Sequence, residues 1–134
     1  HGFVTRDRLF ELLSQADVYV FPSLLEGWPA SIAEALSLGL PVVTTDHQGM
    51  RDMVTPDCGI LVDPSRASRL IDGLSRAFST LAATPDLVEK LSAGALRRAA
   101  EISAEQQMPA ILAAYDRAIQ DLKRAPLATK CEFP

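Results

Sequence analysis

The sequence predicts an α/β fold with a Rossmann-like parallel sheet and flanking helices. Short apolar runs rich in β-branched and aromatic residues alternate with amphipathic helical patterns, and the connections between them are short. This alternation is typical of right-handed βαβ crossovers. A chain of 134 residues with 48% hydrophobic residues is long enough to bury one such core.

The first predicted elements are a helix and a short strand. Thr5 is a suitable N-cap, and apolar residues then recur at helical spacing to about Gln15. Residues 18–21 form an apolar run that stops at Pro22, as expected of a buried parallel strand. The chain should then enter a loop.

The second helix and the second strand follow that loop. Pro29 suits the first helical position, and Gly39 closes the helix. Residues 41–45 form the second strand. Ligands of such folds bind at the carboxyl ends of the strands, so the loops after Phe21 and Thr45 should face one crevice.

The remaining elements complete the domain. A turn is predicted over 46–49, a helical turn over 50–54 and a third strand over 59–62. Three helices are expected after it, over residues 66–82, 85–101 and 104–123, with start signals at Ser65 and at Thr84-Pro85. We therefore expect residues 1–124 to form the domain and 125–134 to be a disordered tail.

Composition excludes several functions. The 13 basic and 17 acidic residues give a net charge of -4 and form no basic stripe, which disfavours nucleic-acid binding. No apolar run approaches the roughly 20 residues that span a bilayer. Cys58 and Cys131 lie far apart, with only His1 and His47 as nitrogen partners, so we expect no metal site and a reducing, cytoplasmic setting.

The start at His1, without Met or a signal peptide, suggests a piece of a longer protein.

Two glutamates carry the functional prediction. Glu26 and Glu34 are eight positions apart, about 12 Å if both were helical, which is too far for a paired acid and base. Two contacts along an extended ligand fit better. Between the two glutamates, the helix start at 29–31 offers free N–H groups and the positive end of the helix dipole to an anion. A diphosphate flanked by two sugars would fit this arrangement.

The ordered motifs resemble a known family, the retaining glycosyltransferases of family 4, also called group 1 glycosyl transferases, whose fold is GT-B. The resemblance rests on the following segments: Gly2-Phe3-Val4, residues 16–23, Glu26-Gly27-Trp28-Pro29, Glu34-Ala35, residues 39–43 and residues 59–64. The two glutamates match the E-x7-E motif of the C-terminal, nucleotide-sugar-binding domain of that family.

The resemblance implies the roles of the site residues. Glu26 would contact the donor sugar and act as the catalytic residue, and Glu34 would bind the ribose hydroxyls. Backbone amides after Glu26 would lie near the hexose and the phosphates. The implied donor-binding set is Glu26, Gly27, Trp28, Pro29, Ala30, Ser31 and Glu34.

The implied reaction transfers a sugar from a nucleoside-diphosphate sugar to an acceptor with retention, without a metal or another cofactor. The acceptor-binding domain and the family's phosphate-binding Arg and Lys would lie upstream of His1, so the isolated chain should be inactive. Gln48-Gly49 replaces a frequent Gly-Gly, Asp52 a frequent Glu, and Pro29 a frequent Gly, which removes one N–H from the helix start.

Simpler interpretations exist for each residue. Glu26 and Glu34 could be ordinary residues at a helix start and on a solvated face. Trp28 could line the sugar site or staple its loop to the domain. His47 could be an acid or base, but a turn histidine without a carboxylate is more often exposed. Asp46 could point into the crevice or simply start the turn.

Two alternatives concern the whole chain. It could be a non-catalytic nucleotide-sugar-binding module, or a truncated remnant with an unpaired sheet edge. The pairs Arg97-Arg98 and Lys123-Arg124 could allow peripheral contact with the inner face of a membrane, although an exposed polar face fits the diluting acidic residues better.

Overall fold

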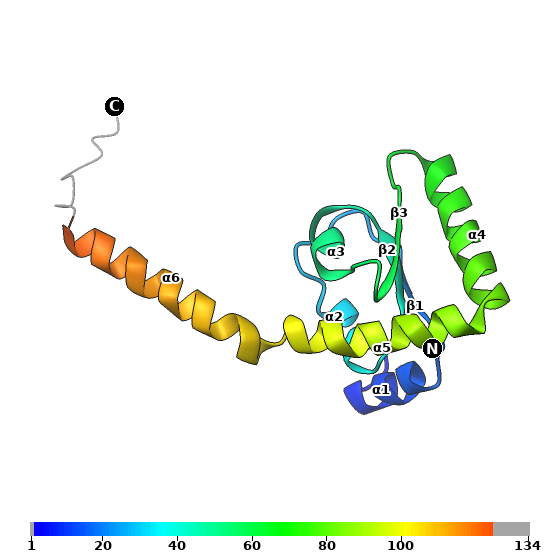
Figure 1. Cartoon of the computed structure of the whole chain (residues 1–134), viewed down its shortest axis with the longest axis horizontal. Coiled ribbons are helices and arrows are strands. Elements are labelled where there is room, and N and C mark those ends of the chain that lie inside the picture. Colours follow the sequence, from blue (N-terminus) through cyan, green and yellow to red (C-terminus); the bar gives the residue numbers. More distant parts are fainter. Residues whose placement is uncertain (1, 125–134) are drawn as a thin grey trace. The chain divides into compact units, whose positions relative to one another are not determined.

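A computed structural model describes residues 2–124. The chain divides into two compact units, with the boundary between Ile102 and Ser103. The elements of the first unit are α1 (Arg6–Ser14), β1 (Tyr19–Phe21), α2 (Ala30–Ser37), β2 (Val42–Thr45), α3 (Gln48–Met53), β3 (Gly59–Val62), α4 (Ala67–Ala83) and α5 (Pro85–Glu101), and the second contains α6 (Ala104–Arg124) (Figure 1).

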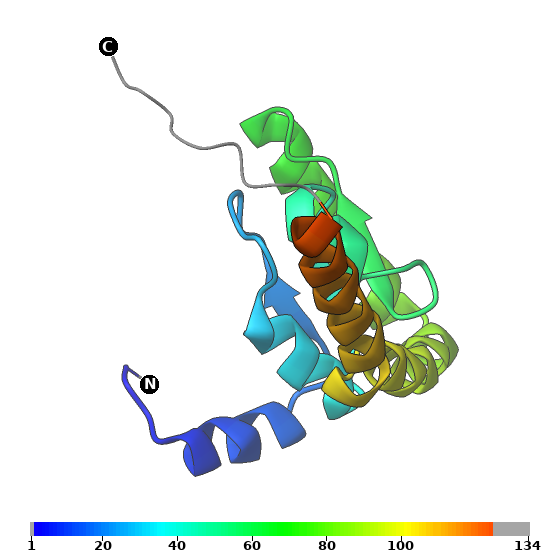
Figure 2. The same cartoon turned by 90° about the vertical axis from the view of Figure 1, so that its left-hand side faces the viewer.

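The sheet of the first unit is parallel, with the strand order β1-β2-β3. Its register pairs Tyr19 with Val42 on one side of β2, and Val42 with Gly59 on the other. Strand β1, the loop that follows it and α2 are seen in blue to cyan in Figure 2. The predicted α/β class with a parallel sheet and flanking helices is confirmed.

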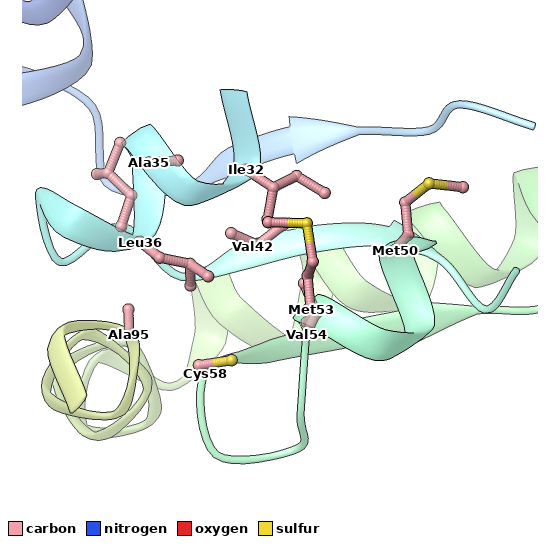
Figure 3. Packing of buried hydrophobic residues seen from close by; sticks show 10 residues of the cluster. Ile32, Ala35, Leu36, Val42, Met50, Met53, Val54, Cys58 and Ala95 are labelled. Atoms are coloured by element: carbon pink, nitrogen blue, oxygen red, sulfur yellow. The ribbon is translucent and has the colours of Figure 1, made fainter. Parts of the chain in front are cut away.

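Strand β2 separates two hydrophobic clusters. Successive side chains of a strand point to opposite faces, so Val42 and Val43 belong to different layers. Val42 packs with residues of α2 and α3, with Cys58 and with Ala95 of α5 (Figure 3). Val43 packs with Val62, with α4 and with Leu91 of α5. The sheet is therefore covered on both faces, as a parallel sheet requires.

Local signals set two helix boundaries as predicted. The Thr5 hydroxyl caps α1 by accepting the N–H of Arg8 at 3.4 Å. Gly39 lies just after the C-cap of α2 with φ +74°, and its N–H donates to the carbonyl of Leu36 at 3.0 Å. A left-handed conformation at this point is easy only for glycine, which is why the helix ends there.

The start of α4 differs from the expectation. Ser65 was expected to give the start signal, but the N-cap is Arg66, which makes no side-chain cap hydrogen bond. Instead, the Asp63 carboxylate accepts the N–H of Ser65 at 2.8 Å and pairs with Arg69 at 2.9 Å. The Arg69 and Ser65 hydrogen bonds lower the pKa of Asp63 to about 2.

Arg98 corrects the expectation of an exposed basic pair on α5. Its guanidinium donates to the carbonyls of Met53 at 3.0 Å and Asp52 at 2.7 Å, at the end of α3, and pairs with Glu101 at 2.9 Å. Only 21% of the Arg98 side chain is exposed. It therefore satisfies carbonyls at the end of α3 and is not an ordinary solvated cation, whereas Arg97 is exposed.

The second unit contains α6, close to the predicted 104–123. Ser103 accepts the N–H of Gln106 at 3.4 Å and so caps the helix start. Apolar residues recur at helical spacing along α6, at Met108, Ile111, Leu112, Tyr115, Ile119 and Leu122. Within residues 2–124, no helix has the length and apolar character needed to cross a membrane. The predicted tail at 125–134 lies outside the described residues.

Candidate functional site

The predicted donor-site residues lie in one continuous stretch at the carboxyl edge of the sheet. The stretch runs from the loop after β1, here called the Glu26 loop (residues 22–29), into the first two turns of α2. Glu26 is half-buried, whereas Gly27 and Trp28 are exposed. The structure thus places Glu26 before the helix and Glu34 within it, as the sequence predicted.

Two buried threonines of β2 bond the end of β1 and the base of the Glu26 loop. The hydroxyl of Thr44 donates to the carbonyl of Phe21 at 2.6 Å, and that of Thr45 donates to the carbonyl of Ser23 at 2.5 Å. Both threonines are completely buried. These bonds give partners to two part-buried carbonyls, one at the end of β1 and one in the Glu26 loop. Sequence reasoning missed both residues, because two threonines at the end of an apolar strand do not indicate which distant carbonyls they bond.

Gln48 and Gly49 hydrogen-bond to the backbone of Glu26. The side-chain oxygen of Gln48 accepts the N–H of Glu26 at 3.2 Å, and the N–H of Gly49 donates to the carbonyl of Glu26 at 3.3 Å. A Cβ at position 49 would overlap the carbonyl oxygen of Gly27, so only glycine permits this approach. The loops after Phe21 and Thr45 therefore lie side by side, as expected.

This contact corrects the prediction for residues 46–54. A turn was expected over 46–49 and a helical turn from Met50, but α3 begins at Gln48 and ends at Met53. Gln48 has φ +43°, the left-handed region that residues with a Cβ rarely adopt. Glycine would adopt this conformation without strain, which fits the Gly that the family resemblance leads us to expect at this position.

The start of α2 corrects the expectation for Pro29. It is the N-cap, with φ -69° and ψ 110°, and not the first helical residue. Because its position precedes the helix, the missing N–H of proline does not subtract from the amides of the first turn. The amides of Ala30 and Ser31 are therefore retained at the positive end of the helix dipole. The Ile32 N–H donates to the Pro29 carbonyl at 3.1 Å.

Glu34 lies in the second turn of α2 and faces α1. Its carboxylate is 3.6 Å from the guanidinium of Arg6, which lies 5.6 Å from the centre of the Phe10 ring. The side chain of Glu34 is 28% exposed and that of Arg6 is 77% exposed. Glu34 is therefore a half-buried group with one accessible, weakly held cation, and not a freely solvated face residue.

The second loop contributes charged groups to a surface hollow. The hollow has a volume of about 510 Å³ and is lined by Leu24, Asp46, His47, Arg51, Asp63, Pro64 and Ser65. Asp46 pairs with Arg51 at 2.5 Å, so its carboxylate is already engaged. His47 is exposed and serves as the N-cap of α3 without a side-chain cap hydrogen bond. The contact with Arg51 favours the interpretation that Asp46 starts the turn, and not that it contacts a ligand in the crevice.

Two further features bear on the chemistry. Trp28 is 53% exposed, so its ring is not buried against the core, as it would be if it fastened the loop to the domain. Among residues 2–124, no three His, Cys, Asp or Glu side chains gather as metal ligands do. The site thus presents carboxylates, amides at a helix start and the exposed ring of Trp28, with His47 and Arg51 at the neighbouring hollow.

Comparisons with known proteins identify the family of the chain. The family described as glycosyl transferases group 1 matches residues 1–93. The MMP alpha-(1->4)-mannosyltransferase of Mycolicibacterium hassiacum is 32% identical over 116 residues, which is 84% of this chain and 27% of that protein. The putative colanic acid biosynthesis glycosyltransferase WcaL of Escherichia coli is 33% identical over 86 residues, 60% of this chain and 21% of that protein.

A solved structure shows the same fold. Sucrose-phosphate synthase from Thermosynechococcus elongatus superposes with a TM-score of 0.75 at 25% identity, over 90% of this chain and 30% of that one. The chain thus spans roughly a quarter of the length of the proteins it matches. With 93 of 134 residues matched by the family and the GT-B neighbour superposed, the chain belongs to the group 1 glycosyl transferases and contains part of a Rossmann-like GT-B domain.

Proposed function

We propose that this chain supplies the donor side of a retaining glycosyltransferase active site, which transfers a sugar from a nucleoside-diphosphate sugar to an acceptor. Glu26 contacts the donor sugar, and Glu34 binds the ribose hydroxyls. One observation carries the proposal: the backbone of Glu26 is fixed on both sides by Gln48 and Gly49, directly before the amide-bearing start of α2.

The start of α2 suits the diphosphate. The amides of Ala30 and Ser31 belong to the first turn, where helix N–H groups have no partner within the helix. They and the helix dipole favour negative charge, which grows on the diphosphate as the bond to the sugar breaks. Donors fixed in advance stabilise such a transition state without reorganisation. No metal is needed for this part of the mechanism.

Glu34 suits a ribose. A carboxylate accepts hydrogen bonds from two neighbouring hydroxyls, and the half-buried position of Glu34 limits competition from water. Its present partner, Arg6, is 3.6 Å away and highly exposed, so the ion pair is worth little and can yield to a ligand. Arg6 can also remain near the ligand and balance the charge of the phosphates.

The relatives support a sugar-transfer reaction in the protein to which the chain contributes. Their names include a mannosyltransferase and a sucrose-phosphate synthase, and on this basis we propose that the sugar transferred by this protein is a hexose. Because the chain spans about a quarter of them, we propose that the acceptor domain is a partner upstream of His1. We propose that the protein acts in the cytoplasm, in peripheral contact with the inner face of the membrane.

Substitutions of the two glutamates test the proposal in the full-length protein. Binding of UDP, GDP and ADP is measured by calorimetry, and transfer from UDP-glucose, GDP-mannose and ADP-glucose by release of the nucleoside diphosphate. Glu34→Ala should weaken nucleotide binding about tenfold or more, the cost of losing hydrogen bonds to a charged acceptor. Glu26→Ala should reduce transfer at least a hundredfold with little change in nucleotide affinity.

The control is Glu89→Ala on α5, which removes an exposed carboxylate far along the chain from both loops. Equal losses of binding and transfer in Glu26→Ala would contradict its assignment to the sugar. Saturable binding by the 134-residue chain without transfer by the full-length protein would identify a binding module. No saturable binding by either would identify a remnant. Retention is checked by comparing the anomeric configuration of product and donor by NMR.

A further inference from the structure

The residue that accepts the N–H of Glu26 has an unfavourable backbone conformation. Gln48 has φ +43°, and it is the one described residue other than glycine with a positive φ. A glycine at this position would relieve the conflict between the Cβ and the backbone. A residue held in such a conformation next to a site suggests a function for its side chain.

The side chain of Gln48 makes a specific long-range contact. It is exposed, and its oxygen accepts the N–H of Glu26 at 3.2 Å across 22 positions of sequence. The next residue, Gly49, donates its N–H to the carbonyl of Glu26 at 3.3 Å. Both backbone polar groups of Glu26 are thus held by adjacent residues of one turn. Neither glycine nor a shorter amide at position 48 could hold the N–H in this way.

We propose that Gln48 is a positioning residue that fixes the backbone of Glu26 and so sets the direction in which its carboxylate leaves the loop. This inference rests on the proposed role of Glu26 at the donor sugar. A fixed backbone limits the positions open to the side chain, and small displacements of a catalytic group cost a large share of its effect. Gln48 acts through Glu26 and does not itself contact the reacting atoms.

The contact can be removed in two ways that differ in backbone strain. Gln48→Gly removes the side chain and relieves the positive φ. Gln48→Asn keeps an amide and tolerates the left-handed region, but it is one methylene too short to reach Glu26. The two variants therefore share the loss of the hydrogen bond and differ in flexibility. If both lose function equally, the reach of the glutamine side chain is responsible.

The experiment measures thermal unfolding, hydrogen exchange of residues 24–30 and donor hydrolysis in the full-length protein with UDP-glucose, GDP-mannose and ADP-glucose. We expect Gln48→Gly to unfold at the wild-type temperature or higher. Both variants should exchange the Glu26 amide about tenfold faster and should show about a tenfold lower kcat, equivalent to 1.4 kcal/mol, with KM nearly unchanged. If Gln48 were merely structural, the substitutions would instead lower the unfolding temperature, and kcat would not fall while KM stays unchanged.

Unchanged exchange at Glu26 in both variants would overturn the proposal, as would faster exchange with unchanged kcat. If the wild-type protein shows no hydrolysis with any donor, the proposed function fails. Exchange then still decides whether Gln48 holds the loop. Gly27→Ala provides a control for the loop, because a Cβ at position 27 meets no atom within 4 Å. It should leave exchange at Glu26 unchanged.

Discussion

Two loops leave the same edge of the sheet and are held in opposite ways. The Glu26 loop depends on partners about 22 positions further along the chain, among them Thr45, Gln48 and Gly49. The connection from β3 to α4 is held by residues no more than six positions apart, since Asp63 binds both Ser65 and Arg69 of α4. The loop proposed to bind the donor is therefore shaped by the tertiary fold, and its neighbour by local sequence.

This difference predicts how each loop responds to mutation. A loop held from outside can be displaced by substitutions in another element, and the displacement reaches its functional group. A loop held by its own side chains loses only the contacts that are removed. Three substitutions, taken from the largest expected effect to the smallest, test whether the two loops differ in this way.

Gly49→Ala should have the largest effect. The added Cβ would overlap the carbonyl of Gly27, so either α3 or the Glu26 loop must move. We expect a loss of about 3 kcal/mol in the free energy of unfolding, at the upper end for overpacking, measured by urea denaturation. Donor binding by the full-length protein should fall as well.

The matched control for that substitution is Gly27→Ala, on the opposite side of the same contact. Position 27 has free space around a Cβ, and its φ is not positive. Its free energy of unfolding should stay within about 0.5 kcal/mol of wild type. Similar losses in the two variants would show that the contact between the loops is not close in solution.

Thr45→Val should have an intermediate effect. Valine keeps the size and β-branching but leaves the carbonyl of Ser23 without its donor. We expect a loss of about 1–2 kcal/mol in the free energy of unfolding. Thr44→Val removes the corresponding bond to Phe21, within the sheet, and should cost a similar amount. Only Thr45→Val should speed amide hydrogen exchange in the Glu26 loop. Equal exchange rates in the two variants would argue against a loop that is held by residues of β2.

Asp63→Asn should have the smallest effect, and one that depends on pH. The pKa of Asp63 is lowered from 3.8 to about 2, so the ionised carboxylate stabilises the fold above the ordinary pKa. That contribution is lost as the pH falls from about 4 to about 2. The variant should melt slightly below wild type at pH 7, and the two melting temperatures should converge near pH 2. Asp72→Asn on α4 is the control, and a gap that persists at pH 2 would exclude this linkage.

Most of the fold could be predicted because its signals are local. The strands end at proline or at turn residues, and Gly39 and Thr5 bound their helices through contacts within four positions. Predicted boundaries failed where a distant partner decided the structure. Helix α3 starts two residues earlier than expected because Gln48 and Gly49 turn toward the Glu26 loop. No local pattern contains that information.

The candidate site divides in the same way. The order of Glu26, the helix start and Glu34 could be predicted, because it follows from one continuous segment. Thr45 and the hold on the Glu26 backbone could not, since both depend on how strands β1 and β2 align. Arg98 gives the same lesson, because its partners Asp52 and Met53 precede it by about 45 positions. An exposed cation and a helix-capping cation look alike in sequence.

The complete burial of β2 has a consequence for the dynamics of the domain. All four of its residues pair with β3, three of them also pair with β1, and it contributes Val42 to one hydrophobic cluster and Val43 to the other. Neither layer can open without exposing a face of this strand to water. We therefore expect the two clusters to unfold as one cooperative unit, and local opening to be confined to the outer helices and loops of this unit.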